Sequence, residues 1–259
     1  MKSGLKGKVV LVTGGAGGIG TQISKVFSEE GAKVIIHYHQ SEKNAEKLAN
    51  ELGCRAIKAD LTDSNQANSL FLQAIEMEGG IDVCIANAGF YPKQSTNLWN
   101  IDDKRWNETI NTNLSLTFNT TREFLKHASK TKQGSLVLVG STAGIYGEAG
   151  HSDYAAAKGA IISGLLNTLK NEVAQIGDGV RVNAVAPGWT LTDKKLKDSL
   201  DDSDVKKITS TMALKKLATP EDVANSIVML ASNKLSNHVT GQIIEIAGGM
   251  EGRQITGIK

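Results

Sequence analysis

Short apolar runs alternate along the chain with longer amphipathic stretches. The runs are rich in Val, Ile and Ala, and each is bounded by polar residues or Gly. They predict seven strands: Val9 to Val12, Lys33 to Tyr38, Arg55 to Ala59, Ile81 to Ala86, Leu136 to Gly140, Val180 to Ala186 and Ile243 to Ile246. The intervening stretches predict helices at about 17–30, 41–52, 64–78, 103–129, 154–175 and from Thr219 onward. Strands that are apolar throughout are typical of a parallel sheet with helices on both faces.

Composition limits the class of protein. The 259 residues include 27 Gly and 3 Pro and are 40% apolar and 22% charged, with no linker-like segment, so residues 1–259 are expected to form a single domain. A formal charge of +2 without a basic stripe indicates that nucleic acid is not a partner. No stretch is apolar enough to cross a bilayer, so no membrane association is expected and the predicted location is cytoplasmic.

The two cysteines, Cys54 and Cys84, have no CxxC or His companion. A reduced state inside the core is therefore expected for both, without a metal site.

The first predicted strand runs directly into a glycine-rich turn and a helix. Gly14 permits a sharp turn, Gly18 leaves no side chain between backbone and ligand, and Gly20, after Ile19, permits close helix packing. The free N–H groups and positive dipole end of the helix favour a pyrophosphate in this turn. The alternative is a tight strand-to-helix connection that binds no ligand.

Further motifs follow this turn in a fixed order. Thr13-Gly14-x-x-x-Gly18-x-Gly20 is followed by Asn87-Ala88-Gly89, Asn113, Ser141 and Tyr154-x-x-x-Lys158. Alone, Tyr-x-x-x-Lys carries almost no information, but the whole series resembles the short-chain dehydrogenase/reductase family over nearly the full chain. The resemblance implies a doubly wound, Rossmann-type α/β fold with a seven-stranded parallel sheet. The family has the turn Asn-Asn-Ala-Gly at this place, and this chain departs from it with Ala86 in place of the first Asn.

The resemblance also implies catalytic roles for four residues. Reduction of a ketone needs a hydride, which the nicotinamide cofactor supplies, and a proton, which the protein supplies. Tyr154 is the expected general acid, and Lys158, one helical turn away, is expected to lower its pKa. Ser141 would orient the carbonyl oxygen. Asn113 would bend its helix around a proton-relaying water, against the alternative of an Asn that merely caps or breaks a helix face.

The expected cofactor is NADP(H) rather than NAD(H). In the family an acidic residue after the second strand selects NAD(H), but here Tyr38 and His39 stand at that place. Two features weaken the preference: the glycine turn has no basic residue just before Gly18, and His39 could be an ordinary surface residue.

The remaining cofactor contacts are carried over from the family. Asp60 with Leu61 would edge the adenine, although Asp60 would equally suit a turn. The group Asn87, Ala88 and Gly89 would lie beside the cofactor. The turn with Pro187, Gly188, Thr190 and Thr192 would hold the nicotinamide end.

Two regions are expected to serve substrate binding and assembly. Residues 189–218 are expected to form a substrate lid, in which lysines such as Lys194, Lys195 and Lys197 attract an acidic substrate or, alternating with Asp, form a solvated face. The loop 90–103 is expected near the substrate. The helices at 103–129 and 154–175 are candidates for subunit contacts in a homotetramer, against the alternative of packing within one subunit.

The sequence therefore predicts an NAD(P)(H)-dependent oxidoreductase that interconverts a ketone and a secondary alcohol. The segments GSTAG, HSDYAAAK and PGWTLTD resemble the 3-oxoacyl-acyl-carrier-protein reductase branch, with a 3-oxoacyl thioester on carrier protein or CoA as the small carbonyl substrate. Carrier-protein docking is only partly supported, because Lys132 fits but Gln175 stands where a basic residue is expected. A sugar or polyol dehydrogenase, and a non-catalytic cofactor-binding regulator, remain alternatives.

Overall fold

The computed structural model describes residues 3–192 and 201–250. Seven parallel strands form one sheet in the order β3-β2-β1-β4-β5-β6-β7. The strands are β1 Val9–Val12, β2 Lys33–Tyr38, β3 Arg55–Lys58, β4 Val83–Ala86, β5 Gln133–Val139, β6 Gly179–Pro187 and β7 Ile243–Ile246. The expected doubly wound α/β fold is confirmed. Because the strand order reverses between β1 and β4, their carboxyl ends flank the crevice in which such sheets bind ligands.

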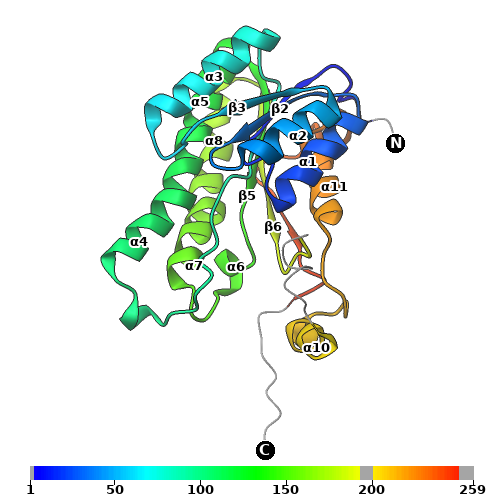
Figure 1. Cartoon of the computed structure of the whole chain (residues 1–259). Helices are drawn as coiled ribbons and strands as arrows, with labels where there is room; N and C mark the ends of the chain where they lie inside the picture. The colour runs from blue at the N-terminus through cyan, green and yellow to red at the C-terminus, as the bar shows by residue number, and fades with distance from the viewer. Residues whose placement is uncertain (1–2, 193–200, 251–259) are drawn as a thin grey trace, which may run out of the picture.

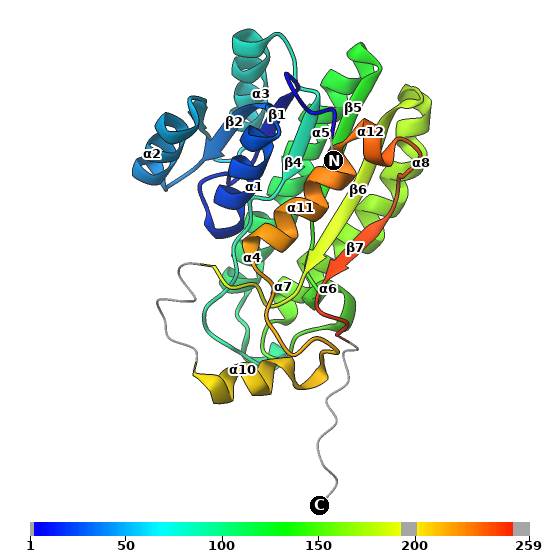
Figure 2. The same ribbon diagram turned by 90° about the vertical axis from the view of Figure 1, so that its right-hand side faces the viewer.

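Helices cover both faces of the sheet (Figures 1 and 2). One face packs against α1 Gly18–Glu29, α2 Glu42–Leu52 and α11 Pro220–Ala231. The opposite face packs against α3 Ser64–Glu78, α5 Leu116–Thr131 and α8 Leu166–Ile176. The sheet thus lies between two apolar cores, which explains why its central strands lack polar alternation.

The two long helices expected beside the site are each interrupted by a wider turn. The first consists of α4 Asp103–Ile110, a π-helical turn η2 Asn111–Ser115 and α5; the second of α7 Ser152–Gly159, a π-helical turn η3 Ala160–Leu165 and α8. Periodicity alone cannot reveal one extra residue in a turn, and such turns are common at functional sites.

Strand and cap details also differ from expectation. β5 begins three residues earlier than predicted because Gln133–Ser135 pair with Gly179–Arg181, and it ends before Gly140. Ser41 stands at the N-cap of α2 but makes no capping hydrogen bond through its side chain. Both cysteines are free thiols, and burial raises the pKa of Cys54 to about 11.

Several short helices were not predicted: η1 Leu98–Asn100, α6 Ala143–Tyr146, α10 Asp202–Ile208, η4 Thr209–Thr211 and α12 Asn233–Ser236. Of these, α10 lies at the carboxyl-end side of the sheet, near α6 and α7 (Figures 1 and 2). It belongs to the predicted lid segment, of which Lys194, Lys195 and Lys197 fall outside the described residues. Within the described ranges no helix combines the length and the apolarity needed to span a bilayer.

Candidate active site

The glycine turn between β1 and α1 is packed so closely that side chains are excluded. A Cβ at Gly20 would lie 2.0 Å from the carbonyl oxygen of Gly14, and one at Gly18 would lie 2.7 Å from Cγ2 of Thr192. Gly17 caps α1 without a side-chain hydrogen bond, so the first N–H groups of the helix have no side-chain cap. Donors of this kind bind an anion, so the turn fits a pyrophosphate. Ile19 is partly buried and packs on the adjoining core.

His37, a residue of β2 that the sequence analysis missed, holds this turn. Its Nδ1 accepts a hydrogen bond from the Gly14 N–H at 3.0 Å, so its Nε2, 3.0 Å from the Ala59 carbonyl oxygen, carries the proton and donates. Burial lowers the pKa of His37 to about 4, although the bond to Ala59 opposes the shift. The imidazole is therefore neutral at physiological pH and fixes the start of the turn.

Asn87 holds the same turn from the end of β4. Its amide donates to the carbonyl oxygens of Thr13 and Gly14, at 2.9 and 3.3 Å. The Thr13 hydroxyl in turn accepts from the N–H groups of Asn87 and Ala88, both at 3.0 Å. These contacts join β1 and β4 on the two sides of the crevice.

The carboxyl ends of β2 and β3 carry the residues expected near the adenosine. Tyr38 is buried, and its hydroxyl donates to Glu42, a carboxylate that the sequence analysis did not consider. His39 is exposed, with Nε2 3.9 Å from Oδ2 of Asp60. Asp60 accepts hydrogen bonds from the N–H and hydroxyl of Thr62, as a turn-forming Asp does. Leu61 is buried beneath this turn.

Ser141, Tyr154 and Lys158 come together at the carboxyl end of β5. Ser141 follows the strand, and a hydrogen bond from it lowers the pKa of Tyr154. Burial nevertheless dominates and, with the charge of Glu148, raises the pKa of Tyr154 to about 12. Nζ of Lys158 lies 5.7 Å from the centroid of the Tyr154 ring.

A lowered pKa was expected for Tyr154, whereas burial raises it, and the hydrogen bond of Lys158 goes to the strand rather than to the phenol. Lys158 is buried, and its Nζ donates to the carbonyl oxygen of Val139 at 2.9 Å. Burial lowers its own pKa to about 8. The ammonium is thus held by the strand rather than by the phenol.

Asn113 lies inside the π-helical turn η2, where its amide donates to the carbonyl oxygens of Phe90 and Thr109, at 2.8 and 3.0 Å. A Cβ at Gly89 would lie 2.9 Å from Oδ1 of Asn113 and 3.4 Å from Nζ of Lys158. The Asn87-Ala88-Gly89 turn, Asn113 and Lys158 are therefore neighbours, and the loop after β4 begins beside them.

The segment after β6 closes the site on the other side. The N–H of Gly188 donates to the carbonyl oxygen of Ile246. The hydroxyl of Thr190 donates to the carbonyl oxygen of Gly188. Pro187 and Thr190 are buried, whereas Thr192 lies against the glycine turn at Gly18. The segment expected at the nicotinamide end thus lies against the glycine turn.

Several residues near Tyr154 had escaped prediction. The ring of Tyr91 stacks on His151 at 4.7 Å and meets Tyr154 edge-on at 5.0 Å, and its hydroxyl donates to Glu148. These contacts confirm that the start of the loop 90–103 borders the site. Asp153 and His151 could have been found, since both stand just before Tyr154 in HSDYAAAK; Tyr91, in the loop after β4, gives no such signal.

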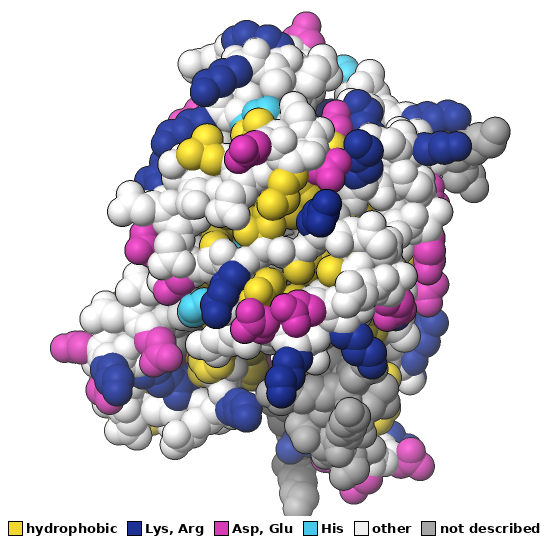
Figure 3. Space-filling model, turned by 45° about the horizontal axis from the view of Figure 1, so that its top comes forward, with side chains coloured by type: hydrophobic (Ala, Val, Ile, Leu, Met, Phe, Trp, Pro, Cys, Tyr) yellow, Lys and Arg dark blue, Asp and Glu magenta, His cyan; other side chains and the backbone are white. Residues whose placement is uncertain are grey.

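The face in Figure 3 carries basic and acidic side chains interspersed, with apolar side chains in a furrow between them. The charged side chains therefore form no continuous patch of one sign on that face.

Comparisons with known proteins agree with this geometry. A family model described as "Enoyl-(Acyl carrier protein) reductase" matches residues 14–251. A 3-oxoacyl-[acyl-carrier-protein] reductase FabG of Thermotoga maritima is 37% identical over 251 residues, which cover 95% of this chain and 98% of that protein. The FabG of Staphylococcus aureus is 31% identical over 248 residues, covering 94% and 98%, and that of Chlamydia muridarum 33% over 257 residues, covering 96% and 100%.

The doubly wound sheet with a glycine turn at its switch point is the architecture of dinucleotide-binding enzymes, and the comparisons indicate an α/β oxidoreductase. The chain belongs to the short-chain dehydrogenase/reductase family and acts on CH–OH groups.

Proposed function

We propose that this protein interconverts a 3-oxoacyl thioester and the corresponding 3-hydroxyacyl thioester, with NADP(H) as cofactor. The observation that carries the proposal is the meeting of Ser141, Tyr154 and Lys158 with Asn113 and Gly89 at the carboxyl edge of the sheet. The 3-oxoacyl reductases among its relatives support the substrate class.

Each side chain has a distinct task in this proposal. Tyr154, with a pKa of about 12, is protonated at neutral pH and donates a proton to the carbonyl oxygen. Ser141 hydrogen-bonds the same oxygen and the phenolate that remains. Lys158 supplies a positive charge behind the phenol, and Asn113 shapes the widened helical turn through which a water would return the proton. The bound nicotinamide would supply or accept the hydride.

The cofactor would lie over the glycine turn. Gly18, Ile19 and Gly20 would bind the pyrophosphate through backbone N–H groups at the start of α1, while Gly14, whose N–H donates to His37, would shape the turn beneath it. Asn87, Ala88 and Gly89 would border its middle. At the adenosine end stand Tyr38, His39, Asp60 and Leu61, and at the nicotinamide end Pro187, Gly188, Thr190 and Thr192.

The proposed preference for NADP(H) rests on the end of β2, where neither Tyr38 nor His39 is acidic. Glu42 is close to Tyr38, but Nζ of Lys58 lies 4.0 Å from its carboxylate and offsets its charge. A 2′-phosphate would thus meet less repulsion than beside an unpaired carboxylate.

The acyl carrier is the least supported part of the proposal. Lys132 ends α5 and could meet an acidic carrier protein, whereas Gln175 on α8 is neutral. We therefore expect small thioesters such as acetoacetyl-CoA to be accepted as well. A sugar or polyol substrate is the competing candidate.

We further propose that the chain works as a single-domain, cytoplasmic homotetramer. Residues 189–218 would cover the substrate, with α10 at the carboxyl edge of the sheet (Figure 2).

The test is NADPH oxidation with a panel of acetoacetyl thioester, 2-enoyl thioester, diketones and sugars. Acetoacetyl thioester should be reduced fastest. Tyr154→Phe should lower turnover about a thousandfold because it removes the proton donor, with NADPH still bound. Tyr146→Phe, a change in the short helix α6, serves as the matched control and should leave turnover intact.

Unchanged turnover by Tyr154→Phe would refute the mechanism. Faster turnover of a sugar than of the acetoacetyl thioester would contradict the proposed substrate class. Dissociation constants for NADPH and NADH, measured on the same preparation, test the cofactor. Tighter binding of NADH would contradict the proposed preference.

A further inference from the structure

Asp153, directly before Tyr154, is a fully buried carboxylate at the start of α7. Its oxygens accept hydrogen bonds from Arg105 and from the hydroxyl of Thr109. Burial would raise the pKa of Asp153, but these hydrogen bonds and the N–H of Tyr154 outweigh burial and hold the pKa below its ordinary value. The carboxylate is therefore charged, and its position is fixed beside the tyrosine.

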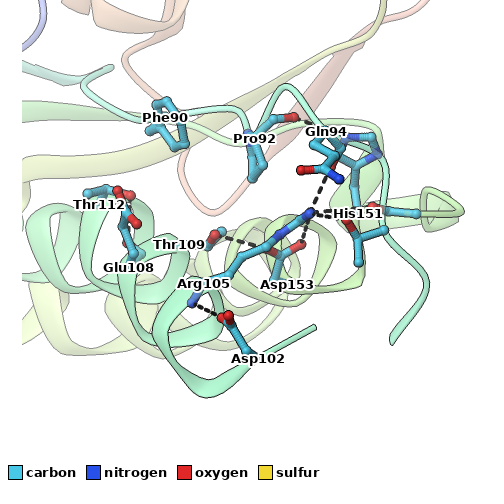
Figure 4. A network of polar contacts seen from close by, with 12 residues as sticks. Phe90, Pro92, Gln94, Asp102, Arg105, Glu108, Thr109, Thr112, His151 and Asp153 are labelled. Carbon is cyan, nitrogen blue, oxygen red and sulfur yellow. Dashed lines mark hydrogen bonds and ion pairs between the residues drawn. The ribbon is translucent and has the colours of Figure 1, made fainter. Parts of the chain in front are cut away.

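Arg105, on α4, uses its whole guanidinium at this place (Figure 4). Nε donates to Asp153 at 2.9 Å, and one terminal nitrogen donates to the Gln94 carbonyl oxygen and the Thr96 hydroxyl at 2.8 and 2.6 Å. The other donates to Gly150 and Asp153, both at 3.4 Å. These five contacts match the five donors of an arginine, which a lysine cannot reproduce.

The pair reaches two parts of the proposed reaction site. Thr109 donates to Asp153 through its hydroxyl, while its carbonyl oxygen accepts from the amide of Asn113. The Gly150 carbonyl oxygen also accepts from the N–H of Thr96, and a Cβ at Gly150 would lie 1.9 Å from Oγ of Ser95. The loop after β4 is thus pinned to the start of α7 where α4 crosses it.

A gain in folding stability does not by itself account for this ion pair. Asp153 is fully buried and the Arg105 side chain is one-fifth exposed, so the pair is costly to desolvate, and buried ion pairs are often replaceable by apolar side chains without loss of stability. What a buried pair supplies is a fixed geometry with no net charge.

We propose that Arg105 and Asp153 are positioning residues that fix Tyr154 relative to Asn113 and hold the loop 91–96 over the site, while their charges cancel one residue before Tyr154. This inference rests on the proposed role of Tyr154.

The charges near Tyr154 allow the direction in which the pH profile moves to be predicted for each variant. Among the described residues the titratable and charged groups that contact Tyr154 or shift its pKa are Lys158, Glu148 and Tyr91, with His151 stacked on Tyr91, and the Arg105–Asp153 pair lies at the residue before Tyr154. Removing Arg105 leaves the buried carboxylate of Asp153 without its ion-pair partner one residue before Tyr154, which disfavours the phenolate. Removing the charge of Asp153 leaves a positive one and favours it.

The experiment measures kcat for alcohol oxidation against pH in Arg105→Gln, Asp153→Asn and the double variant. We expect each single variant to lose about tenfold or more in kcat, because small displacements of a reacting group are costly. The midpoint of the pH profile should move up in Arg105→Gln and down in Asp153→Asn. The double variant, neutral again, should return the midpoint to that of the wild type. NADPH affinity should not change.

Arg181→Gln provides the matched control. Arg181 is a buried arginine with a comparable set of hydrogen bonds, to Leu230, Ala231 and Asn233 among others, but it lies near the start of β6, about 20 Å along the strand from Pro187. This variant should lower the unfolding temperature without moving the pH midpoint of the folded enzyme.

Single variants that keep wild-type kcat and midpoint, or midpoints that move in the same direction, would overturn the positioning role. An active Tyr154→Phe would instead overturn the proposed function on which it rests.

Discussion

At the scale of single residues, burial changes the chemistry of the site more than any neighbouring charge. The pKa of Tyr154 rises to about 12, that of Lys158 falls to about 8 and that of His37 to about 4, each chiefly through burial. Burial disfavours the charged form of any group, which explains why acid and bases shift in opposite directions. His37 shows the consequence for stability most directly.

His37 should make the fold sensitive to mild acid. Its pKa is 6.5 when unfolded and about 4 when folded, so between these values the unfolded chain binds the extra proton. The contribution is complete above pH 6.5 and is lost as pH falls toward 4, up to about 3 kcal/mol. Urea unfolding at pH 7.5, 6 and 5 would measure this contribution. The difference in free energy of unfolding between the wild type and His37→Asn should become smaller as the pH falls.

The exposed His238 supplies the control for this measurement. His238→Asn, a substitution at an exposed position, should lower the free energy of unfolding at pH 7.5 by less than His37→Asn does. A His37→Asn protein with wild-type pH dependence would contradict the role of His37.

At the scale of elements, the site is made by strand ends and interrupted helices. The π-helical turns η2 and η3 lie between α4 and α5 and between α7 and α8, and Asn113 is inside the first. The glycine turn brings α1 against the segment after β6, with Gly18 touching Thr192. A side chain at this contact would push the two elements apart.

Gly18→Ala should therefore weaken cofactor binding. The added Cβ would lie 2.7 Å from Cγ2 of Thr192, well inside van der Waals contact, and relief of such overpacking costs 1–3 kcal/mol. We expect dissociation constants for NADPH and NADH to rise about tenfold, as calorimetric titration would measure. Gly164→Ala, where nothing lies within 4 Å of the added Cβ, should leave both constants unchanged. Equal affinity in Gly18→Ala would show that this contact does not shape the cofactor site.

At the scale of the whole molecule, the two apolar cores leave large apolar side chains exposed at several places among the described residues, two of them on the helices proposed for subunit contact. Trp106 on α4 and Phe118 on α5 are 37% and 48% exposed. Arg122 covers part of the Phe118 ring with its guanidinium at 5.0 Å. Exposed aromatic side chains on these helices are what the proposed subunit contact requires.

Phe118→Glu should break this contact, because it places a charge in the proposed apolar interface. Light scattering after size-exclusion chromatography should show a tetramer for the wild type and a smaller species for the variant. Leu72→Glu on α3, where Leu72 is 59% exposed, serves as the control and should remain tetrameric. A wild-type monomer, or a tetrameric Phe118→Glu, would contradict the proposed assembly.

The sequence by itself determined the seven strands, the glycine turn and the order of Asn113, Ser141, Tyr154 and Lys158, because these depend on local periodicity and spacing. Only the tertiary structure decided that His37 holds Gly14, that Arg105 meets Asp153 and that Lys158 donates to Val139. These contacts join residues 19 to 48 positions apart, and no local pattern encodes them. The same holds for the pKa values, since burial is a property of the packed fold and not of the sequence around a residue.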